Sequence, residues 1–253
     1  QFTPESTVPN LVRLPLPGTD VEVRNAGGET CGPGEEVSLA TAVSLSCNIP
    51  MAEFGMALGY RPIVDMAKKF GFNASFEVPM TTAESHIPQV MDEPQTALAS
   101  FGQFDVRATP LQMALVSATI ANGGVEMYPT LIESITASDL RPLTTFAARE
   151  YSRPISAQTA AQITAMMQAS VSNGAATNAS IENVSVAGKT GTAENGPDEP
   201  YTLWFTGFAP AEGESKYAIT VVVENGGGMG TNGYGNLIAA PIARAVLEAV
   251  LLQ

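Results

Sequence analysis

The chain has 253 residues, of which 45% are hydrophobic and 15% are charged, and its formal net charge at pH 7 is −13. This length and composition allow one large domain or two small ones with a sizeable core, and they exclude disorder of the chain as a whole. The acidity argues against nucleic acid as the main partner, because phosphate binding needs a basic face. No apolar run is long enough to span a membrane, and no secretory signal pattern opens the sequence.

In chain order, a segment rich in glycine, proline and charge comes first, and helical patterns begin at residue 37. Ser38, Pro110 and Ser156 mark helix starts, because each precedes or opens a helical stretch. The expected helices cover residues 38–45, 50–59, 62–70, 110–121, 156–171 and 237–252. Residues 72–109 are expected to be mostly loop. Strand signals are short or weak at 11–14, 21–24 and 125–135 and clearer at 184–188, 201–208 and 217–223. Helices first and strands last indicate an α+β fold.

Lys189-Thr190-Gly191-Thr192 follows the predicted strand 184–188 and suits a carboxylate ligand. The lysine supplies positive charge, the threonine hydroxyls donate hydrogen bonds, and glycine lets a ligand lie against the backbone. Far upstream, Ser46-Cys47-Asn48 falls between two predicted helices, where side chains can point into a cleft. Ser-x-Asn and Lys-Thr-Gly are two of the three motifs of serine β-lactamases and penicillin-binding proteins. The third, the nucleophile-bearing Ser-x-x-Lys, does not occur before any of the four lysines, Lys68, Lys69, Lys189 and Lys216.

Simpler interpretations remain open for these residues on composition alone. Ser46 and Asn48 can be an ordinary capping pair at a helix end, and Lys189 can be a solvated strand lysine. Cys31 and Cys47 can form a bridge in an oxidising compartment or remain two unpaired thiols. His86 is the only histidine, so neither a histidine triad nor a zinc cluster finds support, and we expect no metal and no cofactor.

Several further segments, in order and at fitting spacing, resemble the transpeptidase domain of class B penicillin-binding proteins from about Cys31 to the end of the chain. The matching segments are Ser46-Cys47-Asn48 with Phe54-Gly55, Phe101-Gly102-Gln103, Thr109–Ala114, Ala121–Gly124, Ala187–Glu194 and Trp204–Pro210. The Cys31-Gly32 and Ser46-Cys47-Asn48 pattern looks most like the penicillin-binding protein A branch. The set is specific, whereas any one segment is not.

The resemblance implies the fold shared with serine β-lactamases, in which an antiparallel sheet is flanked by helices beside an all-helical subdomain. Residues 37–175 would be mainly helical, and residues 180–253 would supply sheet strands and the closing helix. The chain would be the C-terminal part of one transpeptidase domain, whose nucleophile lies upstream of residue 1. A disulfide between Cys31 and Cys47 gains support from the extracytoplasmic, membrane-anchored location that the family implies.

The implied reaction is cross-linking of peptidoglycan stem peptides, in which a serine attacks the D-Ala-D-Ala bond and the acyl group passes to an amine. Ser46 would relay protons, Asn48 would bind the substrate amide, and Lys189 would keep the site positive. Thr190-Gly191-Thr192 would hold the substrate carboxylate and supply part of the oxyanion hole. The implied ligands are stem peptides and β-lactam antibiotics, with other cell-wall synthesis proteins as partners.

Two other classes of function compete with this interpretation. A D,D-carboxypeptidase or a serine β-lactamase would use the same motifs, although no convincing Glu-x-x-Leu-Asn pattern lies between them. A non-catalytic penicillin- or peptide-binding module would need no nucleophile at all. Labelling with a fluorescent penicillin would separate the enzymes from the binding module, and the deacylation rate would separate a lactamase from a transpeptidase.

Overall fold

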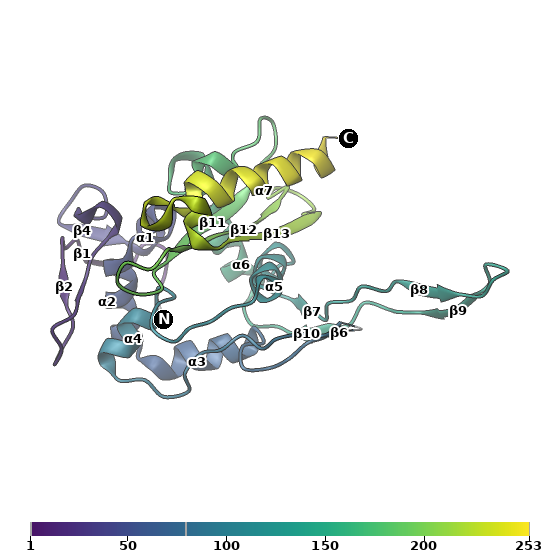
Figure 1. Ribbon diagram of the computed structural model, residues 1–253, viewed down its shortest axis with the longest axis horizontal. Helices are drawn as coiled ribbons and strands as arrows, with labels where there is room; N and C mark the ends of the chain where they lie inside the picture. The colour runs from purple at the N-terminus through teal and green to yellow at the C-terminus, as the bar shows by residue number, and fades with distance from the viewer. Residues whose placement is uncertain (1, 79, 253) are drawn as a thin grey trace.

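A computed structural model describes residues 2–78 and 80–252, and it places helices on both faces of a sheet, with one long hairpin projecting from the body (Figure 1). The helices are α1 (Leu39–Leu45), α2 (Asn48–Leu58), α3 (Tyr60–Lys69), α4 (Glu93–Ala99), α5 (Pro110–Ala121), α6 (Ala157–Asn173) and α7 (Gly235–Leu251). Four 3-10 turns are η1 (Ala26–Gly28), η2 (Thr177–Ala179), η3 (Asn225–Gly228) and η4 (Gly230–Asn232) among the described residues. The strands are β1 (Thr7–Pro9), β2 (Leu14–Pro15), β3 (Glu22–Val23), β4 (Glu36–Ser38), β5 (Glu77–Val78), β6 (Met80–Thr81), β7 (Glu126–Met127), β8 (Ser134–Thr136), β9 (Pro142–Thr145), β10 (Glu150–Ser152), β11 (Ala187–Ala193), β12 (Thr202–Ala209) and β13 (Tyr217–Val223).

The main sheet is antiparallel and has the strand order β11-β12-β13, so β11 lies at its edge. Lys189 pairs with Thr206, and Gly191 pairs with Trp204. The sequence prediction that this strand ends at Gly188 is wrong, because β11 begins at Ala187 and continues through the whole motif to Ala193. Glycine and threonine give a weak local strand signal here, and pairing with β12 overrides it.

The sheet lies between α7 on one face and α5 and α6 on the other (Figure 1). Phe205 packs with Ala240 and Leu247 of α7, and all three are buried. On the opposite face, Phe208 packs with Ile120 of α5 and Met167 of α6 in a second apolar cluster. The period of two along the strand therefore fixes which side chains meet α7 and which meet α5 and α6.

The helix starts predicted at Ser38, Pro110 and Ser156 are confirmed. Ser38 and Ser156 cap α1 and α6, since their side chains accept bonds from backbone N–H groups three residues on. Pro110 is the first residue of α5, whose cap is the preceding Thr109. The interpretation of residues 72–109 as mostly loop is wrong in part, because α4 forms there. Asp92 and Gln95 make a reciprocal capping box at its start, and that Asp-x-x-Gln signal is present in the sequence.

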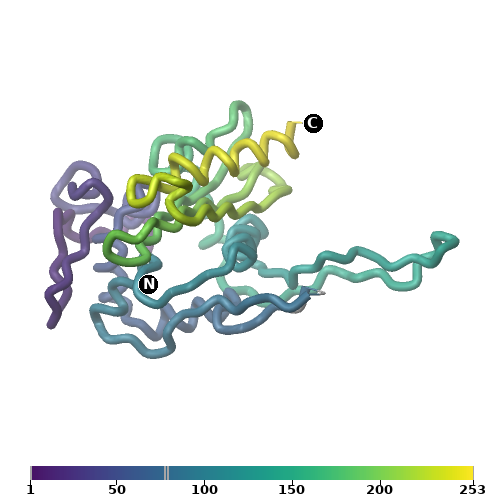
Figure 2. Tube along the Cα trace, viewed as in Figure 1, coloured from purple at the N-terminus to yellow at the C-terminus, as the bar shows by residue number. Residues whose placement is uncertain are grey.

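The weak strand signal at residues 125–135 resolves into parts of a long arm. β7 pairs with β10 at its base, and β8 pairs with β9 further out. Figure 2 follows the same chain as it leaves the body and returns. The short N-terminal strands pair as β1 with β4 and β2 with β3. Within residues 2–78 and 80–252, no helix combines the length and the apolar character needed to cross a bilayer.

Candidate active site

The junction between α1 and α2 presents the Ser-x-Asn motif. Ser46 ends α1 with φ 60° and ψ 47°, and its N–H donates to the carbonyls of Ala42 and Val43. The left-handed conformation costs a non-glycine residue about 1–2 kcal/mol, and it turns the chain so that α2 begins at Asn48 only two residues later. The sequence prediction that the motif lies at the meeting of two helices is confirmed.

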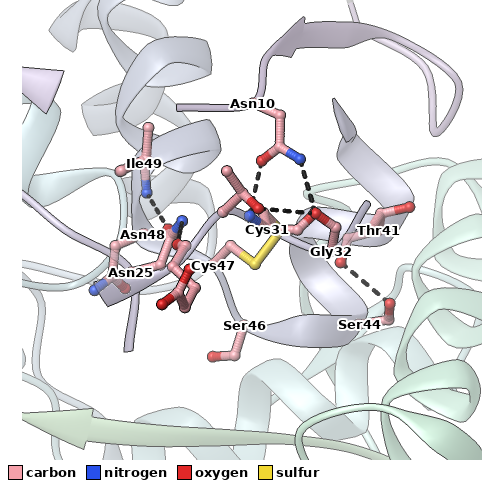
Figure 3. Close-up of a disulfide and its surroundings, with 12 residues drawn as sticks. Asn10, Asn25, Cys31, Gly32, Thr41, Ser44, Ser46, Cys47, Asn48 and Ile49 are labelled. Carbon is pink, nitrogen blue, oxygen red and sulfur yellow. Dashed lines mark hydrogen bonds between the residues drawn. A yellow bond between two sulfur atoms is a disulfide. The ribbon is translucent and has the colours of Figure 1, made fainter. Parts of the chain in front are cut away.

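A disulfide joins the middle residue of this motif to the preceding loop. Cys31 and Cys47 are bonded at an S–S distance of 2.05 Å, and both are buried beside Val37 and Ala42. Asn10 holds the loop from the other side, since its side-chain oxygen accepts from the Cys31 N–H at 2.7 Å (Figure 3). Figure 3 shows the Ser46 side chain directed away from the sulfur atoms. The disulfide therefore restrains the backbone that carries Ser46.

The start of α2 is capped from a distant segment. Cys47 makes no side-chain cap, and the Ile49 N–H donates instead to the side-chain oxygen of buried Asn25 at 3.0 Å. The Asn48 amide nitrogen donates to the Arg24 carbonyl at 2.9 Å. These two bonds tie the end of β3 to the helix that carries the motif. No local sequence pattern indicates this role of Asn25, because its partner lies 24 residues away.

Lys189 of β11 meets Ser46 across the gap between sheet and helices. Its ammonium donates to the Ser46 hydroxyl oxygen at 2.5 Å and to the Thr190 carbonyl at 2.7 Å. The two motif residues are 143 positions apart in the sequence. Because Ser46 accepts this bond, its own hydroxyl proton remains available to a group in the cleft.

Burial lowers the pKa of Lys189 from 10.5 to about 8. Withdrawal from water disfavours the charged form of the amine, and none of the ion pairs among the described residues includes this lysine. At neutral pH the side chain is therefore a cation without a carboxylate partner. Such a cation favours an anionic ligand.

The other residues of the motif take distinct places along β11. The Thr190 hydroxyl is buried and donates to the Ala175 carbonyl at 3.1 Å. The Thr192 hydroxyl is exposed and accepts from the Gly235 N–H at 3.2 Å, which leaves its proton free to donate. At Gly191, an added Cβ would lie 3.2 Å from the Trp204 side chain, tighter than most such contacts. Glycine keeps this part of the edge strand open.

A cleft of about 690 Å³ brings the predicted residues together. Its lining includes Ser46, Asn48 and the stretch from Lys189 to Thr192. A second cavity of about 520 Å³ shares the β11 wall with the cleft, and Phe72, Val106, Met113 and Trp204 are among its lining residues. The cleft thus brings together the Lys189 cation, which has no carboxylate partner among the described residues, the Ser46 hydroxyl, which can pass on a proton, and the open edge of β11. These features suit an extended peptide that ends in a carboxylate.

The cleft also contains residues that the sequence prediction missed. Phe101, Gln103 and Phe104 follow α4 and line it, together with Arg24. The Phe101-Gly102-Gln103 segment carries the family resemblance, but neither composition nor periodicity indicates that it lies on the cleft wall. Phe104 has a backbone φ of 63°, which the sequence does not reveal.

Comparison with known proteins decides the family. The family profile described as "Penicillin binding protein transpeptidase domain" matches residues 16–248. This chain belongs to the penicillin-binding protein transpeptidase family. The relative "Peptidoglycan D,D-transpeptidase PbpA" of Mycolicibacterium smegmatis is 38% identical over 258 residues, covering 99% of this chain and 51% of the relative. PbpA of Mycobacterium tuberculosis is 38% identical over 242 residues, covering 94% of this chain and 49% of the relative.

Solved transpeptidase structures share the fold. The ceftriaxone acyl-enzyme complex of penicillin-binding protein A from M. tuberculosis has a TM-score of 0.93 at 37% identity, covering 98% of this chain and 56% of that one. The penicillin G acyl-enzyme complex of the same protein has a TM-score of 0.90 at 36% identity, covering 99% and 57%. The predicted α+β transpeptidase fold is confirmed. The chain spans about half the length of the curated relatives that it matches.

Proposed function

We propose that this transpeptidase-family chain is part of a peptidoglycan D,D-transpeptidase that cross-links stem peptides by serine acyl transfer. The contact between the Lys189 ammonium and the Ser46 hydroxyl carries the proposal. It supplies positive charge and a proton path on the wall of a cleft that an extended peptide can enter. The acyl-enzyme complexes of the M. tuberculosis relative with β-lactams support the same chemistry.

The roles follow from the donors available. Lys189 and the free proton of Thr192 hold the substrate carboxylate, whereas the Thr190 proton is already committed to Ala175. Gly191 leaves room for the peptide backbone beside the edge strand. Ser46 passes a proton toward the leaving amine, since Lys189 occupies only its acceptor side. Asn48 offers its remaining amide hydrogen and its carbonyl oxygen to the substrate amide.

The nucleophile belongs to a Ser-x-x-Lys segment upstream of residue 1. A serine hydroxyl needs an adjacent base, and the lysine of that segment would act as one. Such a segment can pack into the second cavity, because Val106, Met113 and Trp204 there can contact the apolar face of the helix that carries it. That cavity shares Lys189 with the cleft, so a serine presented from it reaches the relay.

The setting follows from the substrate. Peptidoglycan lies outside the cytoplasmic membrane, so we assign the protein to the extracytoplasmic face, where other cell-wall synthesis proteins are its partners and β-lactams are its inhibitors. The Cys31–Cys47 disulfide suits that oxidising compartment.

The test is labelling of the full-length protein with a fluorescent penicillin, followed by proteolysis and mass mapping. The expected adduct lies on a serine upstream of Gln1 and is released slowly. Rapid release would favour a hydrolase, and the absence of any covalent adduct would favour a binding module. A stable acyl adduct on a serine within residues 1–253 would contradict the assignment of the nucleophile.

A further inference from the structure

Phe104 has an unusual backbone conformation on the cleft wall. Among the described residues other than glycine, those with positive φ are mostly Asn, Asp or Ser, which tolerate it, and the large apolar ones are Phe104 at 63° and Leu140 at 67°. Glycine would make the same turn without the steric cost that a Cβ imposes. Backbone strain of this kind gathers at functional sites, and here the strained residue lines the cleft that holds Lys189.

The turn around Phe104 is held on both sides. The Gln103 N–H donates to the Leu98 carbonyl at 3.0 Å, which ends α4. On the other side, the Asp105 carboxylate pairs with Arg107 at 3.0 Å and lies 3.5 Å from the His86 ring nitrogen. These contacts hold the backbone from which the Phe104 ring projects.

The ring contributes apolar surface to an otherwise polar site. Phe104 is 49% exposed, so its ring does not serve chiefly as core packing. Val21, Leu98 and Phe101 line the same cleft and extend the apolar wall. The β11 wall, by contrast, carries Lys189 and the threonines. A ligand in the cleft therefore contacts polar groups on one side and apolar groups on the other.

We propose that Phe104 is a specificity-determining residue whose ring supports the apolar side chain of the acyl donor. The ligand class is an aromatic or long aliphatic group on the acyl side of the bond that is broken. In a stem peptide, this group is the aliphatic part of an amino-acid side chain. In a penicillin, it is the acylamino substituent. This inference rests on the proposed function, and it adds a preference within the same cleft.

The test compares two penicillins on the full-length protein, benzylpenicillin with its aromatic side chain and 6-aminopenicillanic acid, which lacks one. Phe104→Gly keeps the backbone conformation and removes the ring. It should slow acylation by benzylpenicillin by about 2- to 12-fold, the range expected for one aromatic contact. The rate with 6-aminopenicillanic acid should stay within about twofold, and Phe104→Tyr should restore the preference.

Leu140→Gly is the matched control, because Leu140 shares the positive φ and is 81% exposed in the turn between β8 and β9, away from the cleft lining. It should leave both rates unchanged. Both glycine variants should keep or raise the Tm. An unchanged ratio of the two rates in Phe104→Gly, or an equal loss for both penicillins with a lower Tm, would overturn the proposal. If wild-type protein is acylated by neither penicillin, the proposed function fails as well.

Discussion

Removal of the Cys31–Cys47 disulfide should destabilise the domain by an amount that the loop length fixes. The two cysteines lie 16 positions apart in the sequence. Closing such a loop removes about 10 cal/mol/K of entropy from the unfolded chain, which corresponds to about 3 kcal/mol near room temperature. For a protein of this size that loss lowers the Tm by about 6–12 °C.

Two samples separate the effect of the bond from the effect of packing. Protein refolded in reductant keeps both sulfur atoms but lacks the bond, so it should lose about 3 kcal/mol of unfolding free energy. The double variant Cys31→Ala/Cys47→Ala also loses buried sulfur beside Val37 and Ala42, so it should lose about 1–2 kcal/mol more. Denaturant titration measures both values. A reduced protein as stable as the oxidised one would refute the reasoning.

Three further changes test the supports of the site and the core. Asn25→Ala removes the cap of α2 and should lower the free energy of unfolding by about 1–3 kcal/mol in denaturant titration. Asn25→Asp should recover part of this loss because it keeps the acceptor oxygen. An unchanged unfolding midpoint in Asn25→Ala would count against the cap. Glu126 is 1% exposed, and burial raises its pKa from 4.5 to about 7, so stability should fall as pH rises from about 4.5 through 7. Glu126→Gln should abolish this pH-dependent loss of stability, and it should stabilise the domain by up to about 3 kcal/mol above pH 7 but not below pH 4.5. Equal pH profiles of stability for the variant and the wild type would contradict this. Gly188→Ala places a Cβ against the Phe205 ring and should cost about 1–3 kcal/mol, so a loss under about 0.5 kcal/mol would show that the core adapts.

The sequence predicted elements best where a local chemical signal marked them. Ser38 and Ser156 cap the helices that follow them, because a capping bond depends on residues only three positions apart, and Pro110 opens α5 at a position that tolerates its missing N–H. The loop prediction for residues 72–109 misses α4, although Asp92 and Gln95 carry the same kind of signal, because the prolines of this stretch favour a loop. The end of β11 could not be predicted, because strand pairing, rather than the residues of the motif, defines it.

The site could be predicted only in part, for a related reason. Only the family resemblance connects Ser46 with Lys189 in the sequence, since no local pattern links residues 143 positions apart. Asn25 and Phe104 contribute through tertiary placement and backbone conformation, which composition does not encode. The commitment of the Thr190 proton to Ala175 likewise appears only when β11 meets the end of α6.

The central claim is that the Lys189 ammonium, in contact with Ser46, drives acylation in this cleft. The measurement is the acylation rate of the full-length protein with a fluorescent penicillin, followed from well below to well above pH 8. Wild-type protein should lose rate as pH rises through about 8, where Lys189 gives up its proton. Lys189→Met should slow acylation by about 100-fold or more while the domain stays folded. Exposed Lys216→Met is the control and should behave as wild type. An unchanged acylation rate in Lys189→Met would contradict the account.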